Sequence, residues 1–263
     1  MNLFNFSTIC VTLGIILTIS IPAIKGESGK KNKFRGSHRS KGNCHLKEIH
    51  NCFEKIDRYS NDSDSFKLIT NDPGIDMICS HSKDGINCLK DHMERCATPI
   101  QNEMFEFASE LFSKSIDRFC KDGELRQNFL QHSPCIADSV LSKPEYKEKC
   151  NQPYVAAMDA VSKQTDFDDR LYLTCCSYNR WINCFLEIVS SSCQDSGKQA
   201  MDDFLEKSFA GLSTLICSQD DFLFTSERCK SLYPPEGTIV DPNQVHNPIT
   251  RYMTSHFRFL LTK

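Results

Sequence analysis

Fifteen cysteines constrain this chain of 263 residues more than any other feature. One of them, Cys10, lies in the apolar N-terminal segment. The others show neither the CxxC knuckles nor the Cys/His clusters that zinc sites and redox pairs use. An even number of such cysteines predicts seven disulfides and folding in an oxidising compartment. The fourteen residues expected to form them are Cys44, Cys52, Cys79, Cys88, Cys96, Cys120, Cys135, Cys150, Cys175, Cys176, Cys184, Cys193, Cys217 and Cys229.

The N-terminus predicts secretion. No charged side chain precedes Lys25, and residues 6–19 form an apolar stretch of signal-peptide length. Ala23 and Gly26 are small enough to precede a cleavage point, so we expect residues 1–26 to be removed as a signal peptide. The alternative is an uncleaved anchor, because residues 3–24 are just long enough to span a bilayer.

The cysteine pattern occurs twice. Residues 79–96 read CSHSKDGINCLKDHMERC, residues 176–193 read CSYNRWINCFLEIVSSSC, and 23 residues separate each segment from a further cysteine. The same offset of 97 residues superimposes three apolar pairs, Met104 and Met201, Phe107 and Phe204, and Phe112 and Phe209. Such a period predicts an internal duplication, with module 1 at 44–135 and module 2 at 136–230.

The 23-residue spacers predict helices. Thr98 suits an N-cap and Pro99 the first helical turn, and we expect helices over 99–119 and 198–216. Apolar residues recur at helical spacing in both, which predicts one face packed on a core. In the first copy these are Ile100, Met104, Phe107, Ala108, Leu111, Phe112, Ile116 and Phe119, and in the second Met201, Phe204, Leu205, Phe209, Leu212, Leu215 and Ile216. The fold class expected is all-α, a disulfide-stapled helical bundle that is internally duplicated.

Helix length limits the pairing. A continuous helix of 24 steps is roughly 36 Å long, whereas a disulfide needs Cα atoms within about 7 Å. Cys96 therefore does not bond Cys120, and Cys193 does not bond Cys217. The segment INCLKDHMERC is expected to be a short helix that follows a turn at Asp84 and Gly85.

Two cysteines, Cys44 and Cys175, have no counterpart in the other module. Cys175 is not expected to bond its neighbour Cys176, because the small ring would strain the peptide unit between them. We therefore predict a bond between Cys44 and Cys175 that ties the two modules together. Pairing within modules is otherwise favoured, and the partners stay open.

The rhythm C-x8-C-x7-C-x23-C from Cys79 to Cys120, repeated as C-x7-C-x8-C-x23-C from Cys176 to Cys217, resembles the arthropod haemolymph glycoprotein family. A nematode family of secreted, cysteine-rich helical domains is a competing resemblance. The first implies an extracellular helical protein without known catalytic residues, and it covers about residues 44 to 230. The basic N-terminal segment and the long tail after Cys229 depart from its pattern.

Catalytic motifs are absent from the sequence: it has no GxSxG, HExxH, Walker A or dinucleotide-binding glycine motif. We therefore expect no enzymatic activity and no cofactor. The acidic pairs lack the oxygen spacing and glycine of an EF-hand and are interpreted as solvated helix ends, at Asp168 and Asp169, Asp202 and Asp203, and Asp220 and Asp221. Asn61, in Asn-Asp-Ser, is the expected N-glycosylation site, and Trp181 is expected in the core.

The chain ends are basic. Residues 25–43 contain seven basic residues and one acid, so with a net charge of −3 the rest of the chain is negative. We expect residues 27–43 to be a disordered leader, with polyanion binding or propeptide cleavage at Lys30-Lys31 as alternatives. The candidate polyanion contacts are Lys30, Lys31, Lys33, Arg35, Arg39 and Lys41. A Pro-rich linker at 231–247 precedes an amphipathic helix at 248–263, which either docks on the modules or contacts a membrane or partner.

Two functional classes follow from these patterns. The first, which the duplication and missing catalytic motifs favour, is a secreted non-enzymatic glycoprotein that binds a partner protein or an apolar small-molecule ligand. The second is a secreted defence or venom-type effector that acts at membranes through the basic leader and the C-terminal helix. Nothing in the sequence predicts nucleic-acid binding.

Overall fold

The computed structural model describes residues 44, 48–49, 51–52, 65–161, 163–208 and 217–240. These residues form helices and no strand, which confirms the all-α, disulfide-stapled fold. In chain order the elements are η1 (Ser65–Thr70), α3 (Asp72–Cys96), α4 (Pro99–Cys120), α5 (Glu124–Cys135), η2 (Ile136–Leu141), α6 (Pro144–Tyr146), η3 (Lys147–Asn151), α7 (Gln152–Val161), α8 (Phe167–Ser208) and α10 (Glu227–Leu232). η1 is a 3-10 helix, and η2 and η3 are π-helices.

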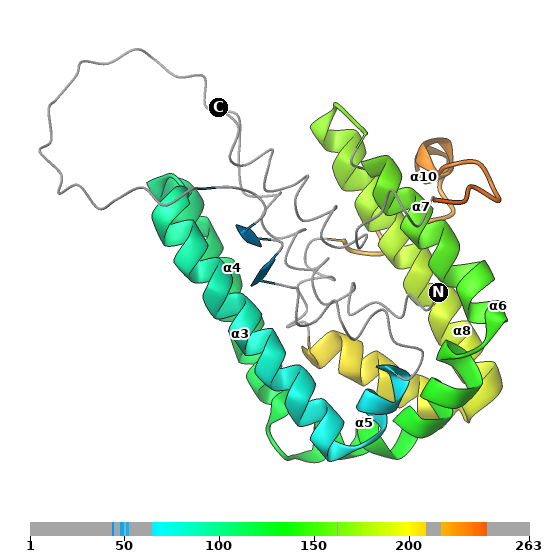
Figure 1. Ribbon diagram of the computed structural model, residues 1–263. Coiled ribbons are helices and arrows are strands. Elements are labelled where there is room, and N and C mark those ends of the chain that lie inside the picture. Colours follow the sequence, from blue (N-terminus) through cyan, green and yellow to red (C-terminus); the bar gives the residue numbers. More distant parts are fainter. Residues whose placement is uncertain are drawn as a thin grey trace, which may run out of the picture.

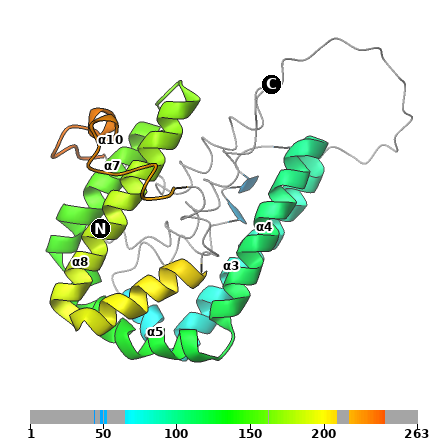
Figure 2. The same cartoon turned by 180° about the vertical axis from the view of Figure 1, so that it is seen from behind.

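Two helical pairs diverge from a common base (Figure 1). On one side α3 and α4 lie antiparallel, and on the other α7 packs along the first part of α8, as both views show (Figure 2). α5 crosses the base where the two pairs meet. We call the α3–α4 pair and the α7–α8 pair the two arms. The first comes from the N-terminal half of the described chain and the second from its C-terminal half.

Local capping explains how α3 turns back into α4. Ala97 and Thr98 have extended backbones, and the Thr98 hydroxyl accepts a hydrogen bond from the backbone N–H of Gln101. The Gln101 side chain accepts one in return from the N–H of Thr98, which completes a capping box. Pro99 occupies the first turn. The predicted N-cap and helix start are therefore confirmed.

The turn predicted at Asp84 and Gly85 is wrong, because α3 continues through both residues. Gly85 lies buried inside the helix. A glycine there costs about 1 kcal/mol relative to alanine, but tertiary packing of the apolar face outweighs so small a local preference. Gly74, in the first turn, has a different role: a Cβ there would lie 2.0 Å from the carbonyl oxygen of Leu68, so η1 can approach only a glycine.

α8 consists of two helical parts. Cys193 and Gln194 have non-helical backbones. Gln194 adopts a φ of 66° and a ψ of 170°, a backbone conformation that residues other than glycine rarely adopt. The chain bends there (Figure 2). The part after the bend is the start of the helix predicted at 198–216, and residues 209–216 lie outside the described residues.

The predicted apolar stripes are confirmed in part. In α8, Met201 and Leu205 are buried, as expected, whereas Phe209, Leu212, Leu215 and Ile216 lie outside the described residues. In α4, Ile116 and Phe119 are buried, but Ile100 and Phe107 are 62% and 65% exposed. The buried face instead includes Phe105 and the small residue Ser109, whose hydroxyl donates to the Glu106 carbonyl. A stripe drawn from apolar residues alone misses a small polar residue that allows close packing.

All fourteen cysteines are paired. The bonds are Cys44–Cys96, Cys52–Cys88, Cys79–Cys120, Cys135–Cys193, Cys150–Cys184, Cys175–Cys217 and Cys176–Cys229. The three pairings excluded from the sequence, Cys96 with Cys120, Cys193 with Cys217 and Cys175 with Cys176, do not occur. Cα atoms of bonded cysteines are 4.9 to 5.9 Å apart, within the usual range.

The predicted bond between Cys44 and Cys175 is wrong. Neighbouring residues of a helix point about 100° apart around its axis, so Cys175 and Cys176 reach different partners. Cys175 bonds Cys217 and Cys176 bonds Cys229, which pins two points of the following segment to α8. Cys44 instead bonds Cys96 at the end of α3.

The disulfides divide the described chain into two sets. None of the seven bonds connects residues 44–120 with residues 135–229, so each half is cross-linked only within itself. The order of pairing is the same in both: the first, second and third cysteines of residues 44–120 bond the fifth, fourth and sixth. Cys135, Cys150 and Cys175 do likewise with Cys193, Cys184 and Cys217. By this order Cys176 and Cys229 are the cysteines without a counterpart, and not Cys44 and Cys175 as predicted. The Cys135–Cys193 bond also crosses the predicted module boundary after Cys135.

This division predicts that the halves are not covalently joined except through the backbone. A site-specific protease sequence inserted in the exposed turn at 121–123 should, once cut, give two fragments on a non-reducing denaturing gel. The matched control is the same insertion in the turn at 163–166, where the Cys135–Cys193 and Cys150–Cys184 bonds span the cut. Its fragments should separate only after reduction. A single band from the first variant without reductant would contradict the pairing.

Non-covalent contacts therefore hold the arms together at α5. Phe119, Phe129 and Phe204, from α4, α5 and α8, form an aromatic triad with ring centroids 4.5 to 5.3 Å apart. α5 then continues into η2, so the boundary expected between Cys135 and Ile136 falls within helical backbone. Pro134 lacks the N–H that would bond the Leu130 carbonyl, and Ser133 Oγ lies 3.4 Å from that oxygen. The wider turns of η2 follow this interruption.

Candidate ligand-binding cleft

A cleft of about 250 Å³ lies in the second half of the chain, between η3, α7, α8 and the segment 233–238. This volume is slightly below the roughly 300–1,000 Å³ that is usual for sites of drug-sized ligands. Small side chains on α7, Ala156 and Ala157, leave the space open. The cleft is therefore suited to a small molecule rather than to a lipid chain or a peptide.

One face of α8 forms a wall of the cleft. Ser177, Arg180, Trp181 and Cys184 all line it, and their spacing of three, four and seven residues places them on the same side of a helix. Cys184 is bonded to Cys150 of η3, which also lines the cleft. A disulfide thus fixes the distance between two walls.

Trp181 is held rigidly by its neighbours. Its Nε1–H donates to the hydroxyl oxygen of Tyr146 at 3.2 Å, and its ring stacks on Phe185 with centroids 5.5 Å apart and planes 11° apart. Burial raises the pKa of the Tyr146 hydroxyl, which therefore stays neutral. Tyr154 of α7 lies beside the indole, with ring centroids 5.6 Å apart. These contacts preorganise an aromatic surface at the cleft.

Ser177 carries a buried hydroxyl that is not hydrogen-bonded. The residue is 3% exposed, and its Oγ has no partner within the described part of the chain. Other helical serines here, such as Ser113 and Ser191, donate to a backbone carbonyl of the preceding turn. An unsatisfied buried hydroxyl costs about 1–3 kcal/mol, so a hydrogen-bond partner for Ser177 would stabilise this part of the cleft wall.

Arg180 is a partly buried cation without a carboxylate partner among the described residues. Its guanidinium carbon lies 5.0 Å from the centre of the Tyr233 ring, in a cation–π contact. The neighbouring cation Lys149 is already paired, with Glu145 at 2.6 Å. Contact with a ring leaves the N–H groups at the edge of a guanidinium available for an acceptor.

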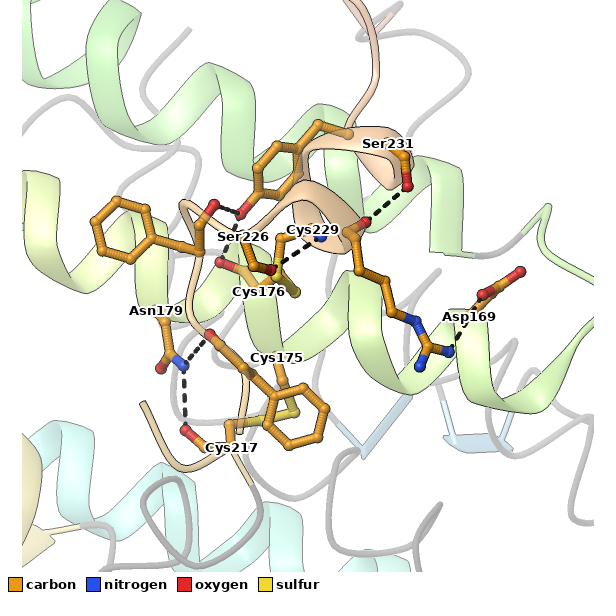
Figure 3. The surroundings of a disulfide bond; sticks show 12 residues. Asp169, Cys175, Cys176, Asn179, Cys217, Ser226, Cys229 and Ser231 are labelled. Carbon is orange, nitrogen blue, oxygen red and sulfur yellow. Dashed lines mark hydrogen bonds and ion pairs between the residues drawn. A yellow bond between two sulfur atoms is a disulfide. The ribbon is translucent and has the colours of Figure 1, made fainter. Parts of the chain in front are cut away.

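The segment that carries Tyr233 is fixed to α8 at several points (Figure 3). Asn179 Nδ2 donates to the carbonyls of Cys217 and Phe222, and Cys229 is bonded to Cys176. The Tyr233 hydroxyl lies 3.1 and 3.0 Å from the carbonyls of Cys176 and Phe224. Burial raises the pKa of Tyr233 to about 12, although Arg180 acts in the opposite direction. Tyr233 therefore donates a hydrogen bond over the whole physiological pH range.

A second cation–π pair on the same segment lies away from the cleft. Arg228 of α10 stacks over the Tyr172 ring at 3.4 Å. Its guanidinium also lies 3.7 Å from the carboxylate of Asp169, which Figure 3 labels. Arg228 therefore has a carboxylate partner, whereas Arg180 has none among the residues that the structure describes. The two arginines make similar ring contacts and differ in whether they border the cleft.

Of the residues that line the cleft, Trp181 alone is a predicted core residue, and Ser177 and Arg180 have no predicted role. Trp181 is buried, as predicted, but it also borders the cleft. Ser177 and Arg180 were not singled out, although their helical spacing from Trp181 was a usable signal. Asp168 and Asp169 lie in the first turn of α8, but Asp202 and Asp203 lie inside its second part, so that pair is not at a helix end. No group of residues suited to hold a metal ion occurs in the described ranges.

Several predicted features lie outside the described residues. They are the signal peptide, the basic leader with Lys30, Lys31, Lys33, Arg35, Arg39 and Lys41, the glycosylation site Asn61, and the C-terminal helix at 248–263. All remain predictions. Of the helices that the structure describes, none has the length and apolar character needed to span a bilayer.

No protein-family model matches the chain, and no curated protein or solved structure matches it either. The resemblance to arthropod haemolymph glycoproteins stays a prediction from cysteine spacing.

Proposed function

We propose that this chain is a secreted, non-enzymatic binding protein that holds a small ligand in the cleft between α7, α8 and residues 233–238. Two groups at this cleft carry the proposal: the buried Ser177 hydroxyl, which has no hydrogen-bond partner in the described chain, and the Arg180 guanidinium, which has no carboxylate partner there. Natural proteins rarely leave such groups without partners unless a ligand or a solvent molecule supplies them. Rigid aromatic walls beside them add apolar contact area.

The sequence predicts an apolar ligand or a partner protein. The small volume of the cleft and its polar lining residues favour a different ligand class. A wholly apolar ligand would leave the guanidinium and the hydroxyl desolvated without hydrogen bonds, which is unfavourable. We therefore favour an amphipathic small molecule. Secretion is supported by seven disulfides, which persist in oxidising compartments.

We also propose that the two halves descend from one duplicated unit and that only the second half binds the ligand. The repeated order of disulfide pairing supports a common origin. If equivalent disulfides of the two halves are aligned, Cys79 corresponds to Cys175 and Cys88 to Cys184. In this alignment Asp84 and Gly85 correspond to Arg180 and Trp181. The first half thus lacks both the cation and the aromatic side chain at the equivalent positions.

The sole tryptophan, Trp181, provides a test of ligand binding. Protein secreted from eukaryotic cells, analysed by native mass spectrometry and then extracted, is expected to release a co-purifying small molecule. Returning the extract to the stripped protein should change Trp181 emission in a saturable way. An Ala157→Leu variant fills the cleft, and a Leu223→Ala variant changes an exposed residue that does not line it. Equal responses from both variants would contradict binding at this cleft.

A further inference from the structure

The charge pattern of the cleft indicates which ligands it accepts. Four charged residues line it, namely Glu148, Lys149, Arg180 and Glu236, and Lys149 is neutralised by Glu145. Of the two cations, Arg180 alone lacks a carboxylate in direct contact within the described chain. A guanidinium presents a planar array of donors that matches a carboxylate oxygen pair. A ligand with one negative charge would therefore complete the site.

A dianionic phosphate fits the same surroundings less well. Glu148 and Glu236, which also line the cleft, repel negative charge, and they repel a dianion about twice as strongly as a monoanion. Free helix N-terminal N–H groups, which commonly bind phosphate, are also missing at the start of α7, because η3 runs directly into α7 and Gln152 N–H bonds the Lys147 carbonyl. The anion expected is therefore a monocarboxylate.

The Ser177 hydroxyl and the Trp181 ring complete the recognition. Ser177 lies one helical turn before Arg180 on the same face of α8, so both residues line the same cleft. Trp181 and Tyr154 supply flat apolar surface next to them. A small acid with an aryl or short alkyl body would use the polar and the apolar surfaces together.

We propose that the cleft binds small aryl or alkyl monocarboxylates, with the carboxylate on Arg180 and Ser177 and the apolar body against Trp181. This inference rests on the proposed function and specifies its ligand class. It applies to the second half of the chain alone, because Asp84 stands where Arg180 would be needed in the first.

The test compares phenylacetate with phenethyl alcohol, phenethylamine and phenyl phosphate, by titration of Trp181 fluorescence and by calorimetry. Phenylacetate is expected to bind about tenfold or more tightly than the alcohol, because a charge-assisted hydrogen bond replaces a neutral one. Phenyl phosphate should bind more weakly than phenylacetate, and the amine should not bind. Hexanoate and hexanol extend the comparison to an alkyl body.

Three variants assign the contacts. Arg180→Gln is expected to weaken phenylacetate binding by about ten- to a hundredfold and to abolish the preference for the acid over the alcohol. Ser177→Ala should weaken binding by about three- to tenfold. Arg228→Gln is the matched control, since it removes a similar cation–π contact outside the cleft and should leave affinity unchanged. If Arg180→Gln disturbs the fold, Arg180→Lys keeps the charge, loses the planar donors and should still lower affinity.

Failure of this inference can be distinguished from failure of the proposed function. Equal affinities for acid and alcohol, or an unchanged preference in Arg180→Gln, overturn the carboxylate proposal while binding at the cleft stands. Absence of saturable binding for both phenylacetate and hexanoate also overturns it. The co-purification experiment with Ala157→Leu decides the proposed function separately, because it presumes no ligand class.

Discussion

Replacing Cys135 and Cys193 together with serine is expected to lower the free energy of unfolding by about 4 kcal/mol. The bond closes a loop with a sequence separation of 58 residues, and a cross-link over such a loop removes much conformational entropy from the unfolded chain. It also joins the end of α5 to the bend of α8. Gly197, whose Cβ would lie only 3.0 Å from Cys193 Cβ, packs closely against this bond.

Denaturant unfolding under non-reducing conditions measures this loss. Ser190→Ala is the matched control, because the Ser190 hydroxyl bonds Asp195 across the same bend through an exposed contact of 2.6 Å. Loss of this hydrogen bond is expected to lower the free energy of unfolding by less than about 1 kcal/mol. A change of similar size in both variants would show that the disulfide does not stabilise the bend.

Arg126→Met is expected to destabilise the protein by about 3 kcal/mol. Arg126 is 4% exposed, and its guanidinium bonds Asp72 and Asp76 of α3 at 2.6 to 2.7 Å and the Cys120 carbonyl of α4 at 3.1 Å. Burial disfavours its charged form, but the hydrogen bonds to Asp76 and Asp72 outweigh this, and the pKa of Arg126 is raised. The residue therefore connects α5 to both helices of the first half.

Two further variants test whether the geometry of these bonds matters. Arg126→Lys keeps the charge but loses the planar donor array, so we expect it to recover less than about half of the lost stability. Arg118→Met, on the exposed side of α4, should change the free energy of unfolding by less than about 0.5 kcal/mol. Full recovery by lysine would mean that charge alone accounts for the effect of Arg126.

Both predictions concern contacts of α5, the helix that connects the two halves of the described chain. The disulfides cross-link each half internally, and the junction depends on the Phe119, Phe129 and Phe204 triad together with Arg126. If this junction is weakened, the halves are expected to move relative to each other while each keeps its own bonds.

The start of α4 could be predicted from the sequence because helix capping depends on residues that are close together in the chain. Thr98 and Gln101 form a capping box and Pro99 occupies the first turn, and the start of α4 was predicted correctly from Thr98 and Pro99. The exclusion of a bond between Cys96 and Cys120 followed in the same way from the length of a helix. The cleft was harder to foresee, because Ser177 and Arg180 are ordinary helical residues until α7 and the segment after α10 are placed against them.

The sequence by itself determined the helical class, the participation of fourteen cysteines and the repeated spacing, since these depend on composition and on short-range periodicity. Only the tertiary structure decided the partners of Cys44, Cys175 and Cys176, because adjacent cysteines on a helix face different directions and their partners come from distant segments. It likewise decided that Asp84 and Gly85 continue α3, where packing of the buried face outweighs the local preference for a turn. Local preferences amount to about 1 kcal/mol per residue, and burial of whole helix faces is worth several times more.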